Sequence, residues 1–205
     1  IGAISNATNY QIVGSKSTRT LEEMKGKTIG VTGAGAFSDF AMRTFLRRKG
    51  IDPDKDLMLR AIGGSNLRAS ALEKGIVAAA PFAPDDTVRL TRIGFPMIAN
   101  LSDTLTIPQT ILTARNEFLE KNPETAKGFL KALILGIQLA KFNKADAIKA
   151  GFEAKLHGEP ELVNLAYDLY APALSSDLSV NISGLQFMLD EDKRNGLIDA
   201  KFTLD

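Results

Sequence analysis

A run of small residues after a β-branched segment is the part of this chain best suited to binding a ligand. Val31 and Thr32 lead into four small residues, and a helical pattern begins shortly after them. Backbone amides at a helix N-terminus are unpaired and carry the positive end of the helix dipole. They suit a carboxylate, a sulfonate or another polar group. The expected contacts are Gly35, Ala36, Phe37, Ser38 and Asp39.

The glycines of this segment could instead serve only to turn the chain tightly. The segment lacks the third glycine of the dinucleotide fingerprint, and no acid lies about 20 residues on at a strand end. No Gly-Lys-Ser/Thr sequence is present, so nucleotide hydrolysis has no support. Asp39 in the first helical turn offsets part of the dipole, which argues against a strongly anionic ligand.

Two further segments carry candidate ligand contacts. The apolar strand expected at residues 76–80 runs into Pro81-Phe82-Ala83-Pro84, which predicts a stiff loop at the carboxyl end of a parallel sheet, where open α/β sheets bind ligands. Phe82 could line that site or fill the top of the core. In the polar segment at residues 5–10, Asn9 and Tyr10 could contact a ligand or belong to a solvated turn.

The composition excludes several classes of function. The 205 residues hold 25 Lys and Arg against 24 Asp and Glu, so the chain lacks the basic surplus that nucleic-acid binding needs. It has no Cys, which excludes thiol chemistry and cysteine metal sites, and the lone His157 is expected at a helix end. We therefore expect no catalytic residue, no metal and no cofactor. No apolar window is long enough to span a bilayer.

The pattern of strands and helices predicts an α/β first half. Short apolar strands are expected at 10–14, 27–32, 57–62, 76–80 and 94–99, with helices between them, and such strands are typical of a parallel sheet covered on both faces. The helix expected at 65–74 would bury Leu67, Ala71 and Leu72. After Pro108 a single strand is expected at 110–114, followed by amphipathic helices to the end. Because one strand cannot form a sheet, these helices should leave an apolar face exposed unless something else covers it.

The order of several motifs resembles one family, the nitrate/sulfonate/taurine-type solute-binding proteins of ABC importers. Residues 21–31, with Lys25-Gly26-Lys27, resemble the entry into that family's second lobe, and the turn to Ser38 falls where it carries a Gly-Ser/Thr ligand loop. Residues 75–80 are similar to its Gly-x-Val-Asp-Ala-Ala strand, and residues 110–133 to its return to the first lobe. Two positions depart from the pattern: Ala78 replaces an aspartate, and Phe82-Ala83 replaces Trp-Glu.

The resemblance implies a type II periplasmic-binding fold, two α/β lobes joined by a hinge that close on a solute. Residues 9–105 would be the second lobe, and residues 1–8 and 106–205 one strand and the helices of a first lobe lacking its N-terminal half. It also implies a non-enzymatic protein of the periplasm, or lipid-anchored outside the cell, although no signal peptide precedes Ile1. The solute would be a small polar or anionic organic molecule, such as a sulfonate, nitrate, carboxylate or pyrimidine, held in the cleft between the lobes. The partner would be a membrane permease.

Two other functions stay open from the sequence. The fold of this family resembles that of thiamine-pyrimidine synthases, but the absence of Cys and the single His count against that enzyme. A ligand-sensing effector domain of a transcription regulator has a similar size, but no helix-turn-helix pattern is present.

Overall fold

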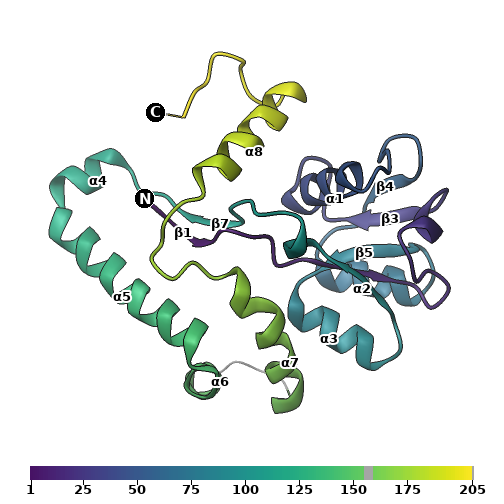
Figure 1. Ribbon diagram of the computed structural model, residues 1–205, viewed down its shortest axis with the longest axis horizontal. Helices are drawn as coiled ribbons and strands as arrows, with labels where there is room; N and C mark the ends of the chain where they lie inside the picture. The colour runs from purple at the N-terminus through teal and green to yellow at the C-terminus, as the bar shows by residue number, and fades with distance from the viewer. Residues whose placement is uncertain (155–158, 205) are drawn as a thin grey trace. The chain divides into compact units, whose positions relative to one another are not determined.

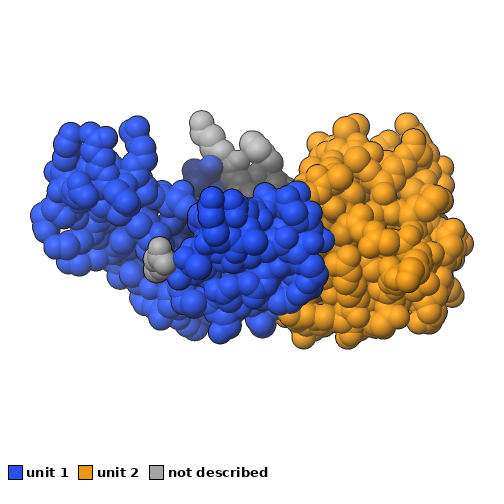
Figure 2. Space-filling model, turned by 90° about the horizontal axis from the view of Figure 1, so that it is seen from above, with its two compact units in different colours: residues 1–8, 106–155, 171–205 blue, residues 9–105, 156–170 orange. Residues whose placement is uncertain are grey.

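The computed structural model describes residues 1–154 and 159–204, which form two compact units (Figure 2). Residues 1–8, 106–155 and 171–205 make unit 1, and residues 9–105 and 156–170 make unit 2. His157, expected at a helix end, lies outside the described residues. Among the described residues, no helix combines the length and the apolar character needed to cross a bilayer.

A five-stranded mixed sheet is the frame of unit 2 (Figure 1). In spatial order its strands are β4 (Met58–Ala61), β3 (Thr28–Val31), β5 (Ala79–Phe82), β2 (Gln11–Gly14) and β6 (Met97–Asn100). Strand β3 is parallel to β4 and β5, whereas β2 is antiparallel to both β5 and β6.

The prediction of a purely parallel sheet is therefore wrong at β2. The link from β2 to β3 contains only the short 3₁₀ helix η1 (Glu22–Met24). A parallel return usually runs through an α-helix. Without that helix, the chain enters β3 in the direction opposite to β2.

Three α-helices follow the parallel strands and cover the sheet. They are α1 (Phe37–Arg48), on one side, and α2 (Ser65–Glu73) and α3 (Pro84–Arg92), on the other (Figure 1). The core beneath α2 and α3 is apolar and consists of Val13, Ala69, Ala71, Leu72, Val77, Ala80, Phe82, Leu90 and Phe95. Leu67, expected to be buried, is 60% exposed.

Strand β5 begins later than the sequence predicted. Ile76, the expected first residue, is 51% exposed, and the strand runs from Ala79 through Pro81 to Phe82. Its ladder with β3 pairs only Ile29 with Ala79, so Pro81 lies beyond that ladder. The stiff loop expected to begin at Pro81 is therefore wrong, and α3 starts almost directly after the strand, at Pro84.

Unit 1 combines a two-stranded sheet with helices. Strand β1 (Gly2–Ser5) pairs antiparallel with β7 (Thr110–Leu112), so the prediction of a single strand is wrong. A strand is stable only beside a partner, and residues 2–5 show no alternation of apolar and polar residues strong enough to reveal one. The helices are α4 (Asn116–Lys121), α5 (Pro123–Phe142), α6 (Lys144–Glu153), the 3₁₀ helix η3 (Ala171–Ala173) and α8 (Ile182–Arg194).

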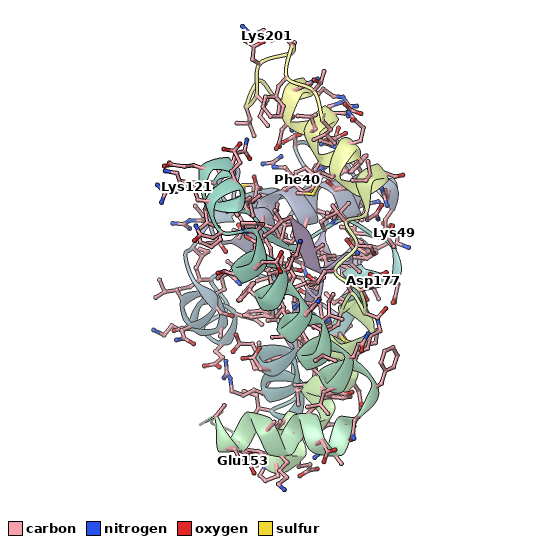
Figure 3. All side chains as sticks on the ribbon, turned by 90° about the vertical axis from the view of Figure 1, so that its left-hand side faces the viewer. Phe40, Lys49, Lys121, Glu153, Asp177 and Lys201 are labelled. Atoms are coloured by element: carbon pink, nitrogen blue, oxygen red, sulfur yellow. The ribbon has the colours of Figure 1, made fainter. Side chains whose placement is uncertain are left out.

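Helix α5 leaves apolar side chains uncovered on unit 1. Its inner side packs Ile137 against Leu174 and Leu178. On its other sides Leu135 is 68% exposed and Phe142 is 71% exposed. Figure 3 shows the side chains of α5 between Lys121, at the end of α4, and Glu153, at the end of α6. The expected exposed apolar face on unit 1 is thus confirmed.

Helix α7 (Pro160–Tyr170) belongs to unit 2, whereas the sequence placed residues 106–205 together in the first lobe. The helix packs against α3. Arg92 of α3 also pairs with Glu159 and, at 3.8 Å, with Glu161. These exposed ion pairs contribute little stability, so packing between the two helices is the main link. A helix can pack against any complementary apolar stripe, and its own sequence does not name the partner.

Candidate functional site

The carboxyl edge of the unit 2 sheet brings the predicted site residues into one region. Strands β3, β4, β5 and β6 all end at this edge, because β2 is antiparallel to both of its neighbours. Strand β2 begins there, directly after Asn9 and Tyr10. Helices α1, α2 and α3 start there as well. Open α/β sheets bind ligands at such an edge.

The loop from Thr32 to Ala36 is held by hydrogen bonds to the first turn of α1. The backbone N–H of Thr32 donates to Ser38 Oγ at 2.9 Å, and that of Gly35 donates to Asp39 Oδ2 at 3.0 Å. The N–H of Ala36 donates to the carbonyl of Gly33 at 3.2 Å. Gly35 has φ +73°, a left-handed conformation that favours glycine.

Other amides of the same loop remain available to a ligand. In the described part of the chain, the N–H groups of Gly33, Ala34, Phe37 and Ser38 donate to no other protein atom. Two of them lie in the first turn of α1, where the helix dipole is positive. Gly33, Ala34 and Phe37 are exposed or partly exposed, so their amides can donate hydrogen bonds to an oxyanion, whereas Ser38 is buried.

The side chains of Ser38 and Asp39 serve the loop, which differs from their predicted role as ligand contacts. Ser38 is 1% exposed and Asp39 is 5% exposed. Asp39 Oδ1 also accepts from Arg43 Nε at 2.9 Å. The backbone groups that each side chain satisfies lie within six residues of it, so both side chains turn inward to pair with them.

We predict that Asp39→Ala loosens this loop. The substitution leaves the Gly35 amide and the Arg43 guanidinium without their shared acceptor, and it should lower the free energy of unfolding by about 1–3 kcal/mol. Asp39→Asn keeps an acceptor for Gly35 and should retain more of that stability. Urea denaturation of both variants measures the difference. Equal stability of Asp39→Ala and the parent chain would show that Asp39 does not anchor the loop.

An aromatic pair lies beside the loop. The rings of Tyr10 and Phe37 are 6.0 Å apart between centroids and tilted by 49°, and Phe40 stacks on Phe37 at 6.4 Å. Phe40 is labelled in Figure 3. Tyr10 and Phe37 are half-buried, so each keeps some accessible apolar surface. Aromatic surface of this kind suits the apolar part of an organic ligand.

Polar side chains fix the start of β2, and with it the position of Tyr10. Gln11, which is fully buried, accepts from Thr87 Oγ1 at 3.2 Å. Its Nε2 donates to the carbonyl of Asn9 at 3.1 Å and to Asn100 Oδ1 at 3.2 Å. Asn9 is therefore held through its carbonyl at the carboxyl edge, next to the aromatic pair.

A buried arginine joins two loops of the carboxyl edge to the end of β5. Arg68 of α2 is 3% exposed. Its Nη1 donates to Thr32 Oγ1 and to the carbonyl of Gly63, both at 2.7 Å, and its Nε donates to the carbonyl of Pro81 at 3.2 Å. All three acceptors are neutral, and Arg68 forms no ion pair with any residue that the structure describes. Burial lowers the pKa of Arg68, and the nearby Tyr10 and Asp86 oppose that shift.

Sequence reasoning missed Arg68 and Thr32 as site residues. One signal was present in the sequence. Helix α2 begins directly after Gly63-Gly64, and Arg68 lies four residues before Leu72 on its buried face. A charged residue on a buried helix face is unusual and often functional. The expected apolar face of Leu67, Ala71 and Leu72 leaves Arg68 outside it, whereas Leu67 is exposed and Arg68 is buried.

Phe82 lies in the core, which corrects the prediction that its ring lines the site. The ring is fully buried in the cluster beneath α2 and α3. The guanidinium of Arg68 lies 5.6 Å above the ring centroid. Phe82 therefore supports Arg68 from beneath and has no surface for a ligand.

No residues suited to a metal were found at this edge. Across the part of the chain that the structure describes, no group of three or more His, Cys, Asp or Glu side chains could hold a metal ion. The chemistry available at the carboxyl edge is instead that of amide donors, hydroxyl groups such as that of Thr32, one buried cation and an aromatic surface.

Comparison with known families identifies the family of the chain. The profile of the NMT1-like family matches residues 3–151. The chain belongs to this family. The match includes the whole of the β2 to β6 sheet and its loops, so the carboxyl edge described above lies within the NMT1-like region. No curated protein matches the chain.

Solved structures show that the NMT1-like chain has the fold of periplasmic binding proteins. It is similar to the periplasmic aliphatic sulphonate-binding protein SsuA from Escherichia coli, with a TM-score of 0.75 at 17% identity over 97% of this chain and 67% of that one. It is also similar to the alkanesulfonate-binding protein SsuA from Xanthomonas axonopodis pv. citri bound to MOPS, with a TM-score of 0.72 at 19% identity over 97% of this chain and 68% of that one. The expected type II periplasmic-binding fold is confirmed.

The same fold also occurs in a protein with a different ligand. A DszB variant in complex with biphenyl-2-sulfinic acid matches with a TM-score of 0.69 at 14% identity, over 97% of this chain and 72% of that one. At this level of identity the likeness concerns the fold, and the chemistry must be argued from the chain's own residues.

Proposed function

We propose that the chain is the solute-binding component of an ABC importer and captures a small anionic organic molecule at the carboxyl edge of unit 2. One observation carries this proposal: unpaired amides, an exposed Thr32 and the buried, unneutralised Arg68 lie together there. These groups are hydrogen-bond donors or positive, and they favour an anion. The SsuA structures, whose names state that they bind sulfonates, support the same class of ligand.

The proposed contacts differ in part from those expected from the sequence. We assign the anionic group to the Thr32 hydroxyl and the free amides of residues 33, 34 and 37. Tyr10 and Phe37 would contact the apolar part of the ligand. Asn9, Gly35 and Ala36 would shape the site through their backbone, and Ser38 and Asp39 would hold the loop.

The wider setting of the protein follows from the same proposal. Unit 2 would be the second lobe of the binding protein, and unit 1 would belong to the first. The chain would act in the periplasm, or anchored by a lipid outside the cell, and deliver its ligand to a membrane permease. Its role would be binding, without a catalytic step.

Two glycines with the same left-handed backbone conformation provide a test of the loop. Gly35 and Gly50 have φ +73° and +76°, and a Cβ on either would meet nothing within 4 Å. Alanine at each should cost about 1–2 kcal/mol of stability, because L-residues are strained in this conformation. Gly35 lies in the site loop, whereas Gly50 follows the far end of α1.

We expect Gly35→Ala to weaken ligand binding and Gly50→Ala to leave it unchanged. Isothermal titration of the whole chain with benzenesulfonate, benzoate, taurine and nitrate measures the affinities, and urea denaturation measures the stabilities. A parent chain that binds none of these anions would overturn the proposed function. Equal loss of binding in the two variants would show that the loop is not the site.

A further inference from the structure

The buried cation of Arg68 donates to the hydroxyl of Thr32, a residue at the surface of unit 2. Arg68 Nη1 donates to Thr32 Oγ1 at 2.7 Å, and Thr32 itself is exposed to solvent. Because the oxygen accepts from Arg68, the hydroxyl hydrogen must point elsewhere. No described residue accepts a hydrogen bond from Thr32 Oγ1, so the hydrogen is free to donate to a ligand. A hydroxyl that accepts from a cation is polarised and becomes a better donor.

The charge of Arg68 is not cancelled by a neighbouring carboxylate. The carboxylate that acts on Arg68 is that of Asp86. That carboxylate accepts from the Ser65 hydroxyl and pairs with Arg89 Nη2 at 3.2 Å. A buried cation with only neutral acceptors is costly, and a bound anion nearby would offset part of that cost.

The apolar surface for the rest of the ligand adjoins this pair. The Thr32 amide is bonded to Ser38, which directly follows Phe37, and the ring of Phe37 contacts Tyr10. Thr32 and Phe37 therefore belong to one loop and the first turn of the helix that follows it, and Tyr10 also acts electrostatically on Arg68. A molecule with an anionic group joined to an apolar group fits both.

We propose that Arg68 is a positioning residue that acts through the Thr32 hydroxyl to select organic oxyanions over their neutral counterparts. The inference rests on the proposed function and deepens it. It assigns the charge selectivity of the site to a side chain that the ligand does not touch. The ligand class is an oxyanion, sulfonate or carboxylate, attached to an aromatic or other apolar group.

The test compares ligands of similar shape that differ in charge. Benzenesulfonate is paired with benzenesulfonamide, and benzoate with benzamide. The parent chain should bind each anion roughly 10- to 100-fold more tightly than its neutral partner, because hydrogen bonds to charged groups are worth more than neutral ones. Inorganic sulfate, which lacks an apolar part, should bind more weakly than benzenesulfonate. The two pairs also distinguish a sulfonate site from a carboxylate site.

Variants then assign the selectivity to the two residues. Thr32→Val removes the hydroxyl and should lose about tenfold or more in affinity for the anions, with little change for the neutral partners. Thr32→Ser keeps the hydroxyl and should restore the preference. Arg68→Gln should reduce the preference, and Arg68→Lys, which keeps the charge, should retain most of it. A merely structural role would weaken both members of each pair alike.

Each outcome decides the proposal. A parent chain that binds the anionic and neutral members equally overturns the inference and leaves the binding function standing. Binding of neither member overturns the proposed function and the inference with it. Equal loss of both members in Thr32→Val also overturns the inference. If Arg68→Gln fails to fold, the comparison of Thr32→Val with Thr32→Ser decides alone.

Discussion

Phe82→Ala is expected to destabilise unit 2 by about 3–5 kcal/mol, because it removes a fully buried ring and leaves a cavity. That is a large share of the roughly 5–15 kcal/mol that stabilises a typical domain. Thermal or urea unfolding of the whole chain measures the loss. Any loss of ligand binding in this variant should follow the loss of folded protein.

Phe82→Leu is the matched control for this prediction. Leucine fills much of the same volume and should cost about 1.5 kcal/mol or less. Its affinity for the ligand, measured under conditions where it is folded, should stay close to that of the parent chain. A Phe82→Ala variant as stable as the parent but unable to bind would show that the ring acts on binding, through the ligand or through Arg68, and would contradict a purely structural role.

Gly14→Ala is expected to cost about 3 kcal/mol or more, because β2 has no room for a side chain at this position. A Cβ on Gly14 would lie 1.9 Å from the Thr18 carbonyl oxygen and 2.7 Å from Ile98 Cδ1. The carbonyl cannot move away easily. Thr18 is held by its own N–H bond to Ser15 at 2.9 Å and by Lys27 Nζ, which donates to its hydroxyl at 2.9 Å.

Gly33→Ala is the control for Gly14→Ala within the same unit. A Cβ on Gly33 would meet nothing within 4 Å, and its backbone is outside the left-handed region. The change in unfolding free energy should be within about 0.5 kcal/mol. Urea denaturation of both variants checks the contrast. Similar stabilities for the two variants would show that the turn at residues 15–18 can move away from the added Cβ without lowering the free energy of unfolding.

Local features of the fold could be read from short stretches of sequence. The strand, turn and helix from Thr28 to Arg48 lie close to the predicted positions. Asn143 and Asn181 precede helices, and each side chain accepts a backbone N–H three residues on. Such caps depend on groups only a few residues apart, so the sequence states them directly.

The direction and register of strands could not be read in this way. Strands β2 and β5 are both buried throughout, yet they run in opposite directions. A strand buried on both faces shows no alternation that would reveal its register or direction. For this reason the sequence pattern predicts the end of β5 too early and assigns Phe82 to a loop.

The sequence by itself determined that a small-residue loop precedes a helix and that cysteine chemistry is excluded, because both depend on residue types and near neighbours. Only the tertiary structure decided that Ser38 and Asp39 turn inward, that Phe82 is core, and that Arg68 meets Thr32. The last pair is separated by 36 residues. Contacts at that distance along the chain follow from how strands pair and helices pack, which local propensity does not specify.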